Sequence, residues 1–514
     1  YSNGNSVGAT MVAPTLLPLL YGASFQASAQ LVAQLAIIPL AKAVSFFGVM
    51  LLIQQQHVRT RIAVQLSVVA LLWIITPTLI AQAGVIGAIH AQLWCEGVLA
   101  VGYVVAGVLR MRLITPAPHP PRHIYICNMH GVSNVGDLAI HQAQLAMLGA
   151  RFPQAQYTLA YAQRTAAQHQ FPQHHVIHGI SHWVYDAHGT IAPLATRLRR
   201  TLALVIAVPV LRWGGRWQVG LSADESAALH AIANADLVCA SGGGYLYDTP
   251  QRAGLWRWLS WDWFLLADMA VAISLGRPLV LLPQSIGPIH NRWFRWGLGW
   301  VTRHASHVYV RESWSAHWLT QHGMPHQIAS DMAWRLAAPV PHQPHTPCVL
   351  GMTVIDWGAQ YAGFGGQAVY EKIMGEVISH YIALGWQVRL FVQCQDHNPA
   401  WDDTLVARRL VDTVAHPALT LMPFIADPRQ LQQAYAQLDR MVTTRLHAAI
   451  LRLACNQPCV VIGYLPKAHG IMHDIGLAAW CFDMAHIDTP ALIAALDQSA
   501  LQYPILARRQ YCLL

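Results

Sequence analysis

The sequence has 514 residues, of which 54% are hydrophobic and only 11% are charged. Soluble domains carry roughly 25% charged residues, so this composition excludes intrinsic disorder and argues against a wholly cytosolic protein. The net charge is +8, yet no run of Lys or Arg occurs, and this disfavours a nucleic acid as the partner. An anionic membrane surface or a phosphorylated small molecule fits better.

The first fifth of the chain is nearly free of charge. Residues 1–109 hold only four charged side chains, Lys42, Arg59, Arg61 and Glu96. Residues 30–53, 62–82 and 85–109 are each long and apolar enough to cross a bilayer, and residues 7–21 have the character of the end of a fourth helix. A plain anchor would explain these helices, but an ionisable Lys42 in mid-span is costly and suggests a functional origin.

The placement of arginine predicts the orientation of these helices. Arg59 and Arg61 lie between the first two full spans, and Arg110 and Arg112 follow the third. By the positive-inside rule both basic segments, and everything after residue 112, are expected in the cytoplasm. We therefore expect a protein of the bacterial inner membrane with its polar part on the cytoplasmic face.

Two segments of this region, LLYGASFQASAQLVAQLAIIPLAKAV and AGVIGAIHAQLWCEGVLAVGYVVAGVL, resemble the last helices of polysaccharide flippases. Such transporters need about a dozen helices around a central site, so three or four cannot transport independently. The resemblance implies a flippase tail in residues 1–114, either truncated or kept as an anchor.

Two Pro-rich stretches divide the remaining chain. Residues 115–122 (TPAPHPPR) predict a stiff linker, and residues 337–347 (AAPVPHQPHTP) predict a hinge between halves at 123–336 and 348–514. In the second half, strand-like and helical segments alternate, which indicates a parallel sheet covered by helices. The predicted strands are 348–354, 387–393, 419–424, 441–443 and 458–463, and the predicted helices are 369–384, 404–414, 428–438 and 447–454.

The first half repeats this pattern less clearly. Residues 123–127, 237–240, 279–283 and 307–310 are short apolar runs of the kind that form buried parallel strands. Two successive Rossmann-like domains predict the two-domain α/β architecture called GT-B, preceded here by transmembrane helices. Its ligands would bind at the carboxyl ends of the strands.

Several polar loops follow these predicted strands. In the first loop, Asn134, Gly136 and Asp137 open a helix; Asp137 either caps it, the commoner role, or acts as a base. Residues 241–245 (SGGGY) form either an anion-binding nest or a tight turn. Residues 283–288 (PQSIGP) and 310–313 (VRES) place further polar groups at the same edge.

The most informative segments are Thr444-Arg445-Leu446-His447 and the stretch GYLPKAHG that contains Lys467. Each follows a strand and begins a helix, where the helix dipole adds partial positive charge. Arg can clamp a carboxylate or phosphate, Lys adds a point charge, and His is the usual proton shuttle near neutral pH. The pattern predicts a site for a small polyanion that gains or loses a proton.

Together the segments NVGDLAI, SGGGYLYD, PQSIGP, VRESWS, SDMAW, MTV, TTRLHAAI and GYLPKAHGIMHDIGL resemble the polysaccharide pyruvyltransferase family, most closely its colanic-acid-type members. The resemblance covers residues 123–480 in order. One departure is that Ile355-Asp356-Trp357 stands where many relatives carry an Arg. One anion contact is therefore either missing or supplied by Arg311.

The resemblance implies transfer of pyruvate from phosphoenolpyruvate to two sugar hydroxyls, with release of phosphate and no other cofactor. It implies that His447 is the acid or base and that Arg445 and Lys467, with Arg311, bind the donor. Asp137 would orient or deprotonate an acceptor hydroxyl. The remaining residues expected on the acceptor side are Asn134, Gly136, Gly242, Gly243, Gly244 and Gln284. No spacing of ligands indicates a metal site.

Nine of the 19 tryptophans fall between Trp213 and Trp300, where Trp alternates with Arg. Residues 196–213 add three arginines before an apolar run too short to span a bilayer. Trp and Arg together are favoured at the lipid headgroups. This face could therefore lie on the cytoplasmic leaflet and receive a lipid-linked oligosaccharide, or its helices could be ordinary core helices.

Two other functions are compatible with the sequence. A nucleotide-sugar glycosyltransferase of the same fold would need a carboxylate for the ribose after a late strand, where this chain has Gly463-Tyr464 and then Lys467. The other alternative is a flippase-associated subunit whose α/β part is inactive.

Overall fold

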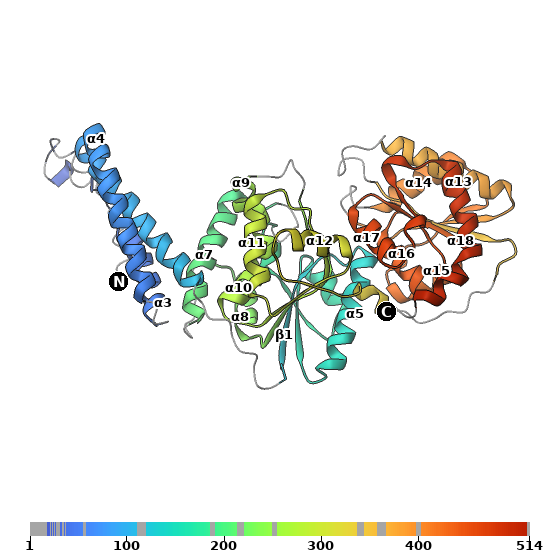
Figure 1. Ribbon diagram of the computed structural model, residues 1–514, viewed down its shortest axis with the longest axis horizontal. Coiled ribbons are helices and arrows are strands. Elements are labelled where there is room, and N and C mark those ends of the chain that lie inside the picture. Colours follow the sequence, from blue (N-terminus) through green and yellow to red (C-terminus); the bar gives the residue numbers. More distant parts are fainter. Residues whose placement is uncertain are drawn as a thin grey trace. The chain divides into compact units, whose positions relative to one another are not determined.

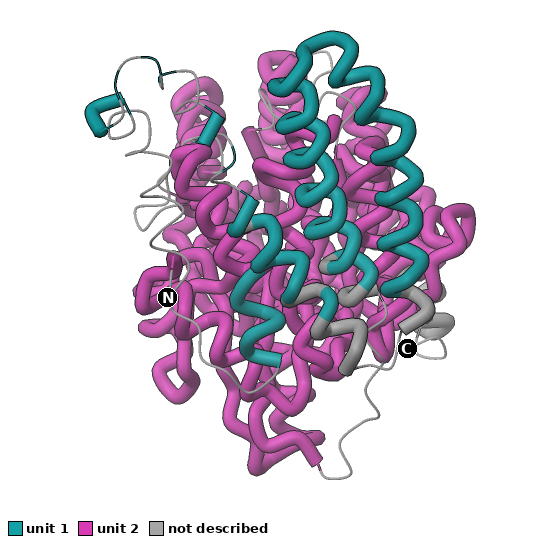
Figure 2. The backbone as a smooth tube through the Cα atoms, turned by 90° about the vertical axis from the view of Figure 1, so that its left-hand side faces the viewer, with its two compact units in different colours: residues 1–114, 206–216 teal, residues 115–205, 217–514 magenta. Residues whose placement is uncertain are grey.

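The computed structural model describes residues 18–20, 22, 24, 26, 31–32, 35, 38–54, 58–109, 120–185, 191–212, 220–248, 254–336, 344–356, 366–396 and 402–510. The chain forms two compact units (Figure 2): residues 1–114 with 206–216, and residues 115–205 with 217–514. The first unit is helical, and the second holds two parallel sheets with helices on both faces of each (Figure 1).

The first unit contains α3 (Ile38–Gln54) and α4 (Val58–Leu109). Although α4 is one continuous run of helix, it reverses at Gly84, whose backbone is non-helical (φ 55°, ψ −129°). After the reversal Gly87 approaches Leu79 so closely that a β-carbon would lie 1.9 Å from its carbonyl oxygen, and a β-carbon on Gly102 would lie 3.0 Å from Val64. Residues 38 positions apart in a straight helix would be about 57 Å apart. Thus α4 is a hairpin of two antiparallel arms.

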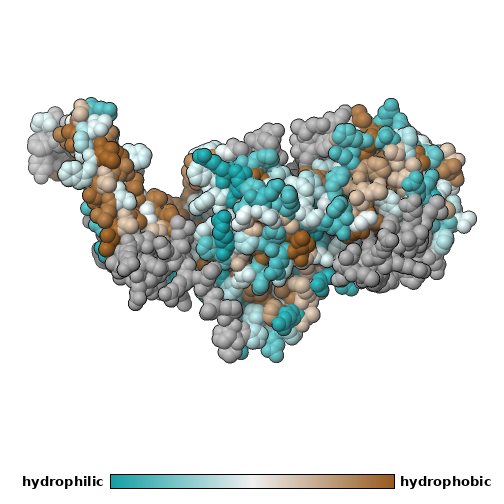
Figure 3. All heavy atoms as spheres, in the orientation of Figure 1, coloured by the Kyte–Doolittle hydropathy of each residue, from teal (hydrophilic) through white to brown (hydrophobic). Residues whose placement is uncertain are grey.

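This hairpin confirms the predicted break at Ala83-Gly84. Residues 61–103 of α4 are long and apolar enough to cross a membrane by length and composition, and its helices are largely hydrophobic on the face seen in Figure 3. The mid-span Lys42 of α3 has a partner: its Nζ lies 3.7 Å from Glu96 Oε1 of α4. Most of the predicted helix at residues 7–21 lies outside the described residues, and so do Arg110 and Arg112.

The first sheet has eight parallel strands in the order β3-β2-β1-β4-β6-β7-β8, with β5 paired to β6. The strands are β1 (His123–Met129), β2 (Gln156–Tyr161), β3 (His175–His178), β4 (Leu237–Ala240), β5 (Gly243–Leu246), β6 (Leu279–Ile286), β7 (His307–Val310) and β8 (Gln327–Ile328). The helices are α5 (Val135–Arg151), α6 (Arg164–Gln170), η2 (Ile180–His182), α7 (Leu194–Arg212), α8 (Ala223–Asn234), α9 (Leu255–Arg257), η4 (Trp258–Asp262), α10 (Phe264–Ser274), α11 (Arg292–His304), α12 (Ser313–Gln321) and η5 (Met332–Leu336). The four strands predicted in this half are all present.

The second sheet has six parallel strands in the order β11-β10-β9-β12-β13-β14. These are β9 (Val349–Thr353), β10 (Gln387–Phe391), β11 (Leu419–Leu421), β12 (Arg440–Thr443), β13 (Val460–Gly463) and β14 (Cys481–Asp483). The helices are α13 (Gln367–Ala383), α14 (Asp403–Val414), α15 (Pro428–Ala436), α16 (Leu446–Ala454), α17 (Pro466–Asp474), η7 (Ala478–Trp480), η8 (Met484–His486) and α18 (Thr489–Gln510). All nine elements predicted in this half are confirmed. Both sheets have the strand order of a Rossmann fold, which confirms the predicted two-domain α/β class.

Helix α5 connects the cores of the two sheets. Leu138, Leu145 and Leu148 pack in the core of the first sheet. Other α5 residues, including Val135 and Ala139, pack with η5, α15 and α16 in a core that belongs to the second sheet. The two sheets therefore share a continuous apolar interior. Most of both predicted linkers, residues 115–119 and 337–343, lies outside the described residues.

Candidate functional site

The two sheets meet through loops at the carboxyl ends of their strands. The loop after β1 runs beside the loop after β10: the Val135 amide donates to the Gln393 carbonyl at 3.0 Å, and Ser133 Oγ donates to Asp396 at 2.8 Å. Because β1 and β4 flank the point where strand order reverses in the first sheet, this edge is where a doubly wound fold binds its ligands.

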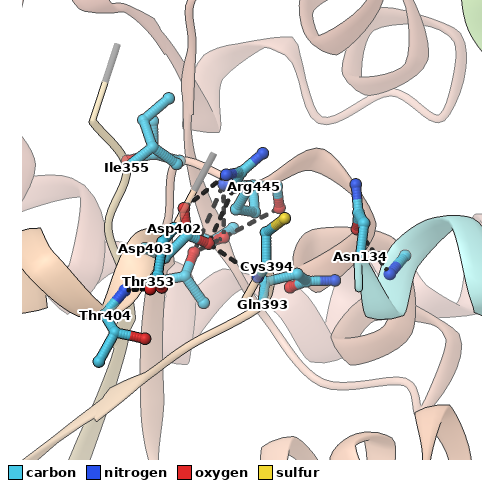
Figure 4. A network of polar contacts seen from close by, with 12 residues as sticks. Asn134, Thr353, Ile355, Gln393, Cys394, Asp402, Asp403, Thr404 and Arg445 are labelled. Carbon is cyan, nitrogen blue, oxygen red and sulfur yellow. Dashed lines mark hydrogen bonds and ion pairs between the residues drawn. The ribbon is translucent and has the colours of Figure 1, made fainter. Parts of the chain in front are cut away.

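Asn134 is the N-cap of α5. Its side-chain oxygen accepts a hydrogen bond from the Gly136 amide at 2.9 Å, and Figure 4 shows it beside Cys394 of the second sheet. The expectation that Asp137 more commonly plays the capping role was therefore wrong. Asp137 lies in the first turn, half-buried, and no described residue donates a hydrogen bond to its carboxylate.

Gly136 is where α5 meets His447. A β-carbon at this position would lie 2.5 Å from His447 Nδ1 and from its β-carbon. His447 is in the first turn of α16, so the imidazole of the second sheet packs directly on the helix start of the first sheet. Only glycine leaves that space, which gives Gly136 a positioning role that the sequence did not reveal.

The Arg311 guanidinium is fully buried at the end of β7. Its Nε donates to Ser285 Oγ at 2.8 Å, and its Nη1 donates to Asp331 Oδ2 at 2.6 Å. Its Nη2 is buried and has no partner among the described residues. One nitrogen of this group thus remains available to a ligand.

Asp331 is the partner that sequence reasoning did not identify, although it lies in the quoted segment SDMAW. Its side chain is fully buried, and Oδ1 also accepts from the Ala333 amide at 2.8 Å. Burial alone would raise the pKa of Asp331, but the neighbouring Arg311 and His447 hold that pKa well below its usual range. Asp331 is therefore an anion that fixes Arg311 from the side opposite a ligand.

His447 shares this network. Its Nε2 lies 3.3 Å from Arg311 Nη1 and 3.8 Å from Asp331 Oδ2. A guanidinium can only donate, so the contact with Arg311 needs a lone pair on Nε2 and places the imidazole proton on Nδ1. A protonated imidazole would instead turn its Nε2 hydrogen toward Asp331. The geometry therefore supports both protonation states.

Lys467 approaches Arg311 across Gly244. A β-carbon at Gly244 would lie 3.0 Å from Arg311 Nη2 and 3.3 Å from Lys467 Nζ, so both nitrogens lie against the same glycine. Burial, together with the positive charges of Arg311 and Arg445, lowers the pKa of Lys467 to about 8, while Asp137 opposes the shift. The described structure shows no hydrogen bond or ion pair of its ammonium.

Arg445 has a partner of its own, as Figure 4 shows. Its Nε donates to Asp403 Oδ2 at 3.0 Å and its Nη2 to the other carboxylate oxygen, while the Cys394 amide also donates to Oδ2. Although burial disfavours its charge, the Asp403 carboxylate holds the pKa of Arg445 above its usual value. Two of its nitrogens are thus committed within the protein. Nothing local in the sequence indicated this pair, whose members are 42 positions apart.

The remaining predicted residues lie at the same edge. Gly243 and Gly244 belong to strand β5, so this segment is neither the nest nor the tight turn considered from the sequence. Gly242 packs where a β-carbon would lie 2.5 Å from the Pro283 carbonyl. Both polar atoms of the buried Gln284 side chain lack partners among the described residues. At the position where many relatives carry an Arg, Ile355 is buried and Asp356 pairs with Arg409 at 3.2 Å.

One family model matches the greater part of this chain. The family model described as Polysaccharide pyruvyl transferase matches residues 134–466, more than half of the chain, from Asn134 to one residue before Lys467. The Amylovoran biosynthesis protein AmsJ of Erwinia amylovora is 24% identical over 250 residues, which cover 44% of this chain and 59% of that relative.

Two solved structures align with this chain at low identity. UDP-GlcNAc 2-epimerase from Neisseria meningitidis, bound to UDP-GlcNAc, aligns with a TM-score of 0.43 and 9% identity over 76% of this chain and 93% of that one. The E. coli heptosyltransferase WaaC aligns with a TM-score of 0.35 and 13% identity over 73% of this chain and 99% of that one.

Proposed function

Because the chain belongs to the polysaccharide pyruvyl transferase family, we propose that it transfers pyruvate from phosphoenolpyruvate to two hydroxyls of a sugar. The observation that carries this proposal is Arg311 Nη2, a buried donor without a partner among the described residues that lies against the same glycine, Gly244, as the Lys467 ammonium. Leaving a buried donor unpaired costs about 1–3 kcal/mol. An anionic ligand that accepts from Nη2 would remove this cost.

Phosphoenolpyruvate presents a carboxylate and a phosphate on neighbouring atoms of a three-carbon unit. Arg311 and Lys467 each supply one cationic nitrogen beside Gly244. The helix start at Lys467 adds partial positive charge. In this proposal Arg445 contributes the field of its charge, since Asp403 already occupies two of its nitrogens. Of the three residues that the sequence predicts to bind the donor, Arg311 and Lys467 therefore form the direct clamp in this proposal.

The reaction needs a proton at C3 of the donor. In the unliganded protein His447 Nε2 faces Arg311 Nη1. An anion bound on Arg311 adds negative charge beside the imidazole and favours its protonated form, and Asp331 Oδ2, at 3.8 Å, stabilises that form further. His447 would then donate its proton to C3, which leaves C2 cationic.

Two new C–O bonds form at C2 of the donor, and one C–O bond breaks there. The first sugar hydroxyl attacks C2 and gives up its proton to Asp137 or to the newly neutral His447. The bond between C2 and the phosphate oxygen then breaks, and the second hydroxyl attacks the cation that results. Overall, one hydroxyl proton ends in the methyl group and the other leaves with phosphate, so no oxidant or other co-reactant is required.

Asp137 is suited to the acceptor because its carboxylate is half-buried, follows the Gly136 on which His447 packs, and accepts no hydrogen bond from a described residue. Its negative charge also opposes the lowering of the Lys467 pKa, so the two groups lie within electrostatic reach. The unpaired amide of Gln284 is a second candidate to hold the sugar.

Binding of phosphoenolpyruvate to the detergent-purified full chain, measured by calorimetry, tests the donor. We expect Lys467→Met and Arg311→Met to weaken binding at least ten-fold. Lys372→Met is the matched control, because the Lys372 side chain is 76% exposed. Unchanged affinity in Arg311→Met would refute the donor assignment.

Turnover is tested by phosphate release with a panel of p-nitrophenyl glycosides in D₂O. We expect one deuterium in the methyl group of the product. His447→Gln should abolish release, whereas His473→Gln, at a 75% exposed side chain, should not. Release that depends on a nucleotide-sugar would instead support a glycosyltransferase.

We also propose that the sugar acceptor is lipid-linked and that the site lies on the cytoplasmic face of the bacterial inner membrane. The hairpin of α4 supports this, because its reversal at Gly84 brings both ends of the helix to the same side. Arg59 and Arg61 lie in the first turn of the first arm, and in the sequence Arg110 and Arg112 follow the last residue of the second arm. Protease accessibility of the α/β unit in inverted and right-side-out vesicles distinguishes the two orientations.

A further inference from the structure

Two neighbouring helical segments that cover the first sheet, α9–η4 and α11, expose large apolar side chains. Leu255, Trp256 and Leu259 of the α9–η4 segment are exposed, Trp256 by 62%, and Trp296 of the neighbouring α11 is 60% exposed. We call these four residues the tryptophan patch. Large aromatic side chains left this open on a folded domain commonly mark an interaction surface.

The two segments of the patch are packed together from beneath. Trp258 of η4 stacks on Phe294 of α11 with ring centroids 6.1 Å apart. It also lies where a β-carbon on Gly297 would be 2.5 Å away, so glycine at that position lets η4 seat on α11. The exposed side chains flanking Trp258 and Gly297 therefore belong to one surface of fixed shape.

Helix α7 extends this surface. The Arg197 guanidinium donates to the Ser260 carbonyl of η4, which ties the two segments together. Leu198, Leu202 and Val205 of α7 are exposed at a spacing of four and three residues, so they lie along one side of the helix. The exposed apolar area thus continues from the tryptophan patch onto α7.

The charge around this surface has one sign. On α11 the exposed Arg292 lies one turn before Trp296, and the exposed Arg303 lies two turns after it. The segments α7, α9–η4 and α11 carry eight arginines and one carboxylate, Asp262, which is buried and paired with Arg257. Arg199 and Arg200 of α7 pair with the buried Glu225 of α8. These segments therefore present guanidinium groups and no exposed carboxylate among their described residues.

We infer that the tryptophan patch and the adjoining side of α7 rest on the headgroup region of an anionic bilayer. Trp prefers the boundary between headgroups and acyl chains, and Arg can lie along an apolar surface while its charge meets lipid phosphates. The inference deepens the proposed function, since a lipid-linked acceptor would be presented from that same bilayer.

Photolabelling tests this contact in the full chain, reconstituted in vesicles whose phosphatidylglycerol carries a diazirine in its acyl chain. We expect labelled peptides that contain Trp256 and Trp296, in addition to those from residues 58–109. In the double variant Trp256→Gln, Trp296→Gln the label near these positions should fall at least five-fold. The matched control, Val369→Gln with Leu384→Gln, alters exposed apolar residues of the second sheet and should change nothing.

Two outcomes would overturn the inference: label confined to residues 58–109, or cross-links from the patch to a second copy of the chain in place of lipid. A kinetic comparison separates this inference from the proposed function. The double variant should raise the KM for a lipid-linked acceptor at least five-fold and leave turnover of a soluble glycoside unchanged. Absence of turnover in the unmodified protein would refute the proposed function, while the labelling result would still decide the bilayer contact.

Discussion

The low pKa of Lys467 makes a specific prediction about donor binding. Burial and the charges of Arg311 and Arg445 lower that pKa to about 8. At pH 9 only about a tenth of the free protein then carries a charged Lys467. If the ammonium binds phosphoenolpyruvate, the donor selects that tenth, so its apparent KM should rise about ten-fold between pH 7 and pH 9.

The same pKa shift affects folding stability in the opposite way: a higher pH weakens donor binding but stabilises the fold. Because the pKa of Lys467 is lower in the folded state than its usual 10.5, the folded chain binds fewer protons than the unfolded chain between pH 8 and 10.5. The contribution of Lys467 to the free energy of unfolding therefore rises with pH across that window, and below it the charged lysine destabilises the fold. An anion relieves this cost, so inorganic phosphate should raise Tm more at pH 7 than at pH 9.5.

Initial rates of phosphate release as a function of pH provide the assay. Lys467→Arg keeps its charge throughout this range, so the rise in KM above pH 8 should disappear in that variant. The exposed Lys372→Met is the control and should retain the rise. An equal rise in Lys467→Arg would refute the reasoning, because another group would then be titrating.

The remaining predictions concern the groups around this lysine. Gly136→Ala places a β-carbon 2.5 Å from His447 and should lower kcat about 100-fold; Gly149→Ala, in the same helix with open space around it, should leave kcat unchanged. Gly244→Ala should raise the KM for phosphoenolpyruvate about ten-fold with kcat nearly constant, as titration of the donor in steady state would show. Asp331→Asn removes the carboxylate that fixes Arg311 Nη1 and lies 3.8 Å from His447 Nε2, so it should lower kcat, as initial rates of phosphate release would show.

The strands were predictable because buried parallel strands are short apolar runs. Strands β4 and β7 have the predicted bounds, and their buried residues are all hydrophobic: Val238, Cys239, Ala240, Val308 and Val310. Strand β5 was missed since its sequence begins with two glycines, which normally indicate a turn. Its pairing with β6 comes from tertiary contact and not from local preference.

The location of the candidate site was predictable from the sequence, but the ion pairs within it were not. Parallel strands bring their carboxyl ends to one edge of each sheet, and ligands of the two-domain architecture bind at these edges. Arg311 of the first sheet could therefore be placed with His447 and Lys467 of the second. Which carboxylate neutralises which arginine depends on packing between distant segments. Arg311 and His447 are 136 positions apart, and the sequence offers no rule that assigns Asp331 to one arginine and Asp403 to the other.

Helix α5 explains why this site can be preorganised. One side of the helix is buried in the core of the first sheet, and another is buried with α15 and α16 of the second. Rotation of one sheet against the other would have to expose that shared core, and large apolar interfaces between domains disfavour such motion. The start of the same helix carries Asn134, Gly136 and Asp137, and Gly136 packs directly on His447. The distance from the proposed acid to the proposed acceptor group is therefore set by apolar packing, and substitutions that loosen this core should reduce turnover before they unfold either sheet.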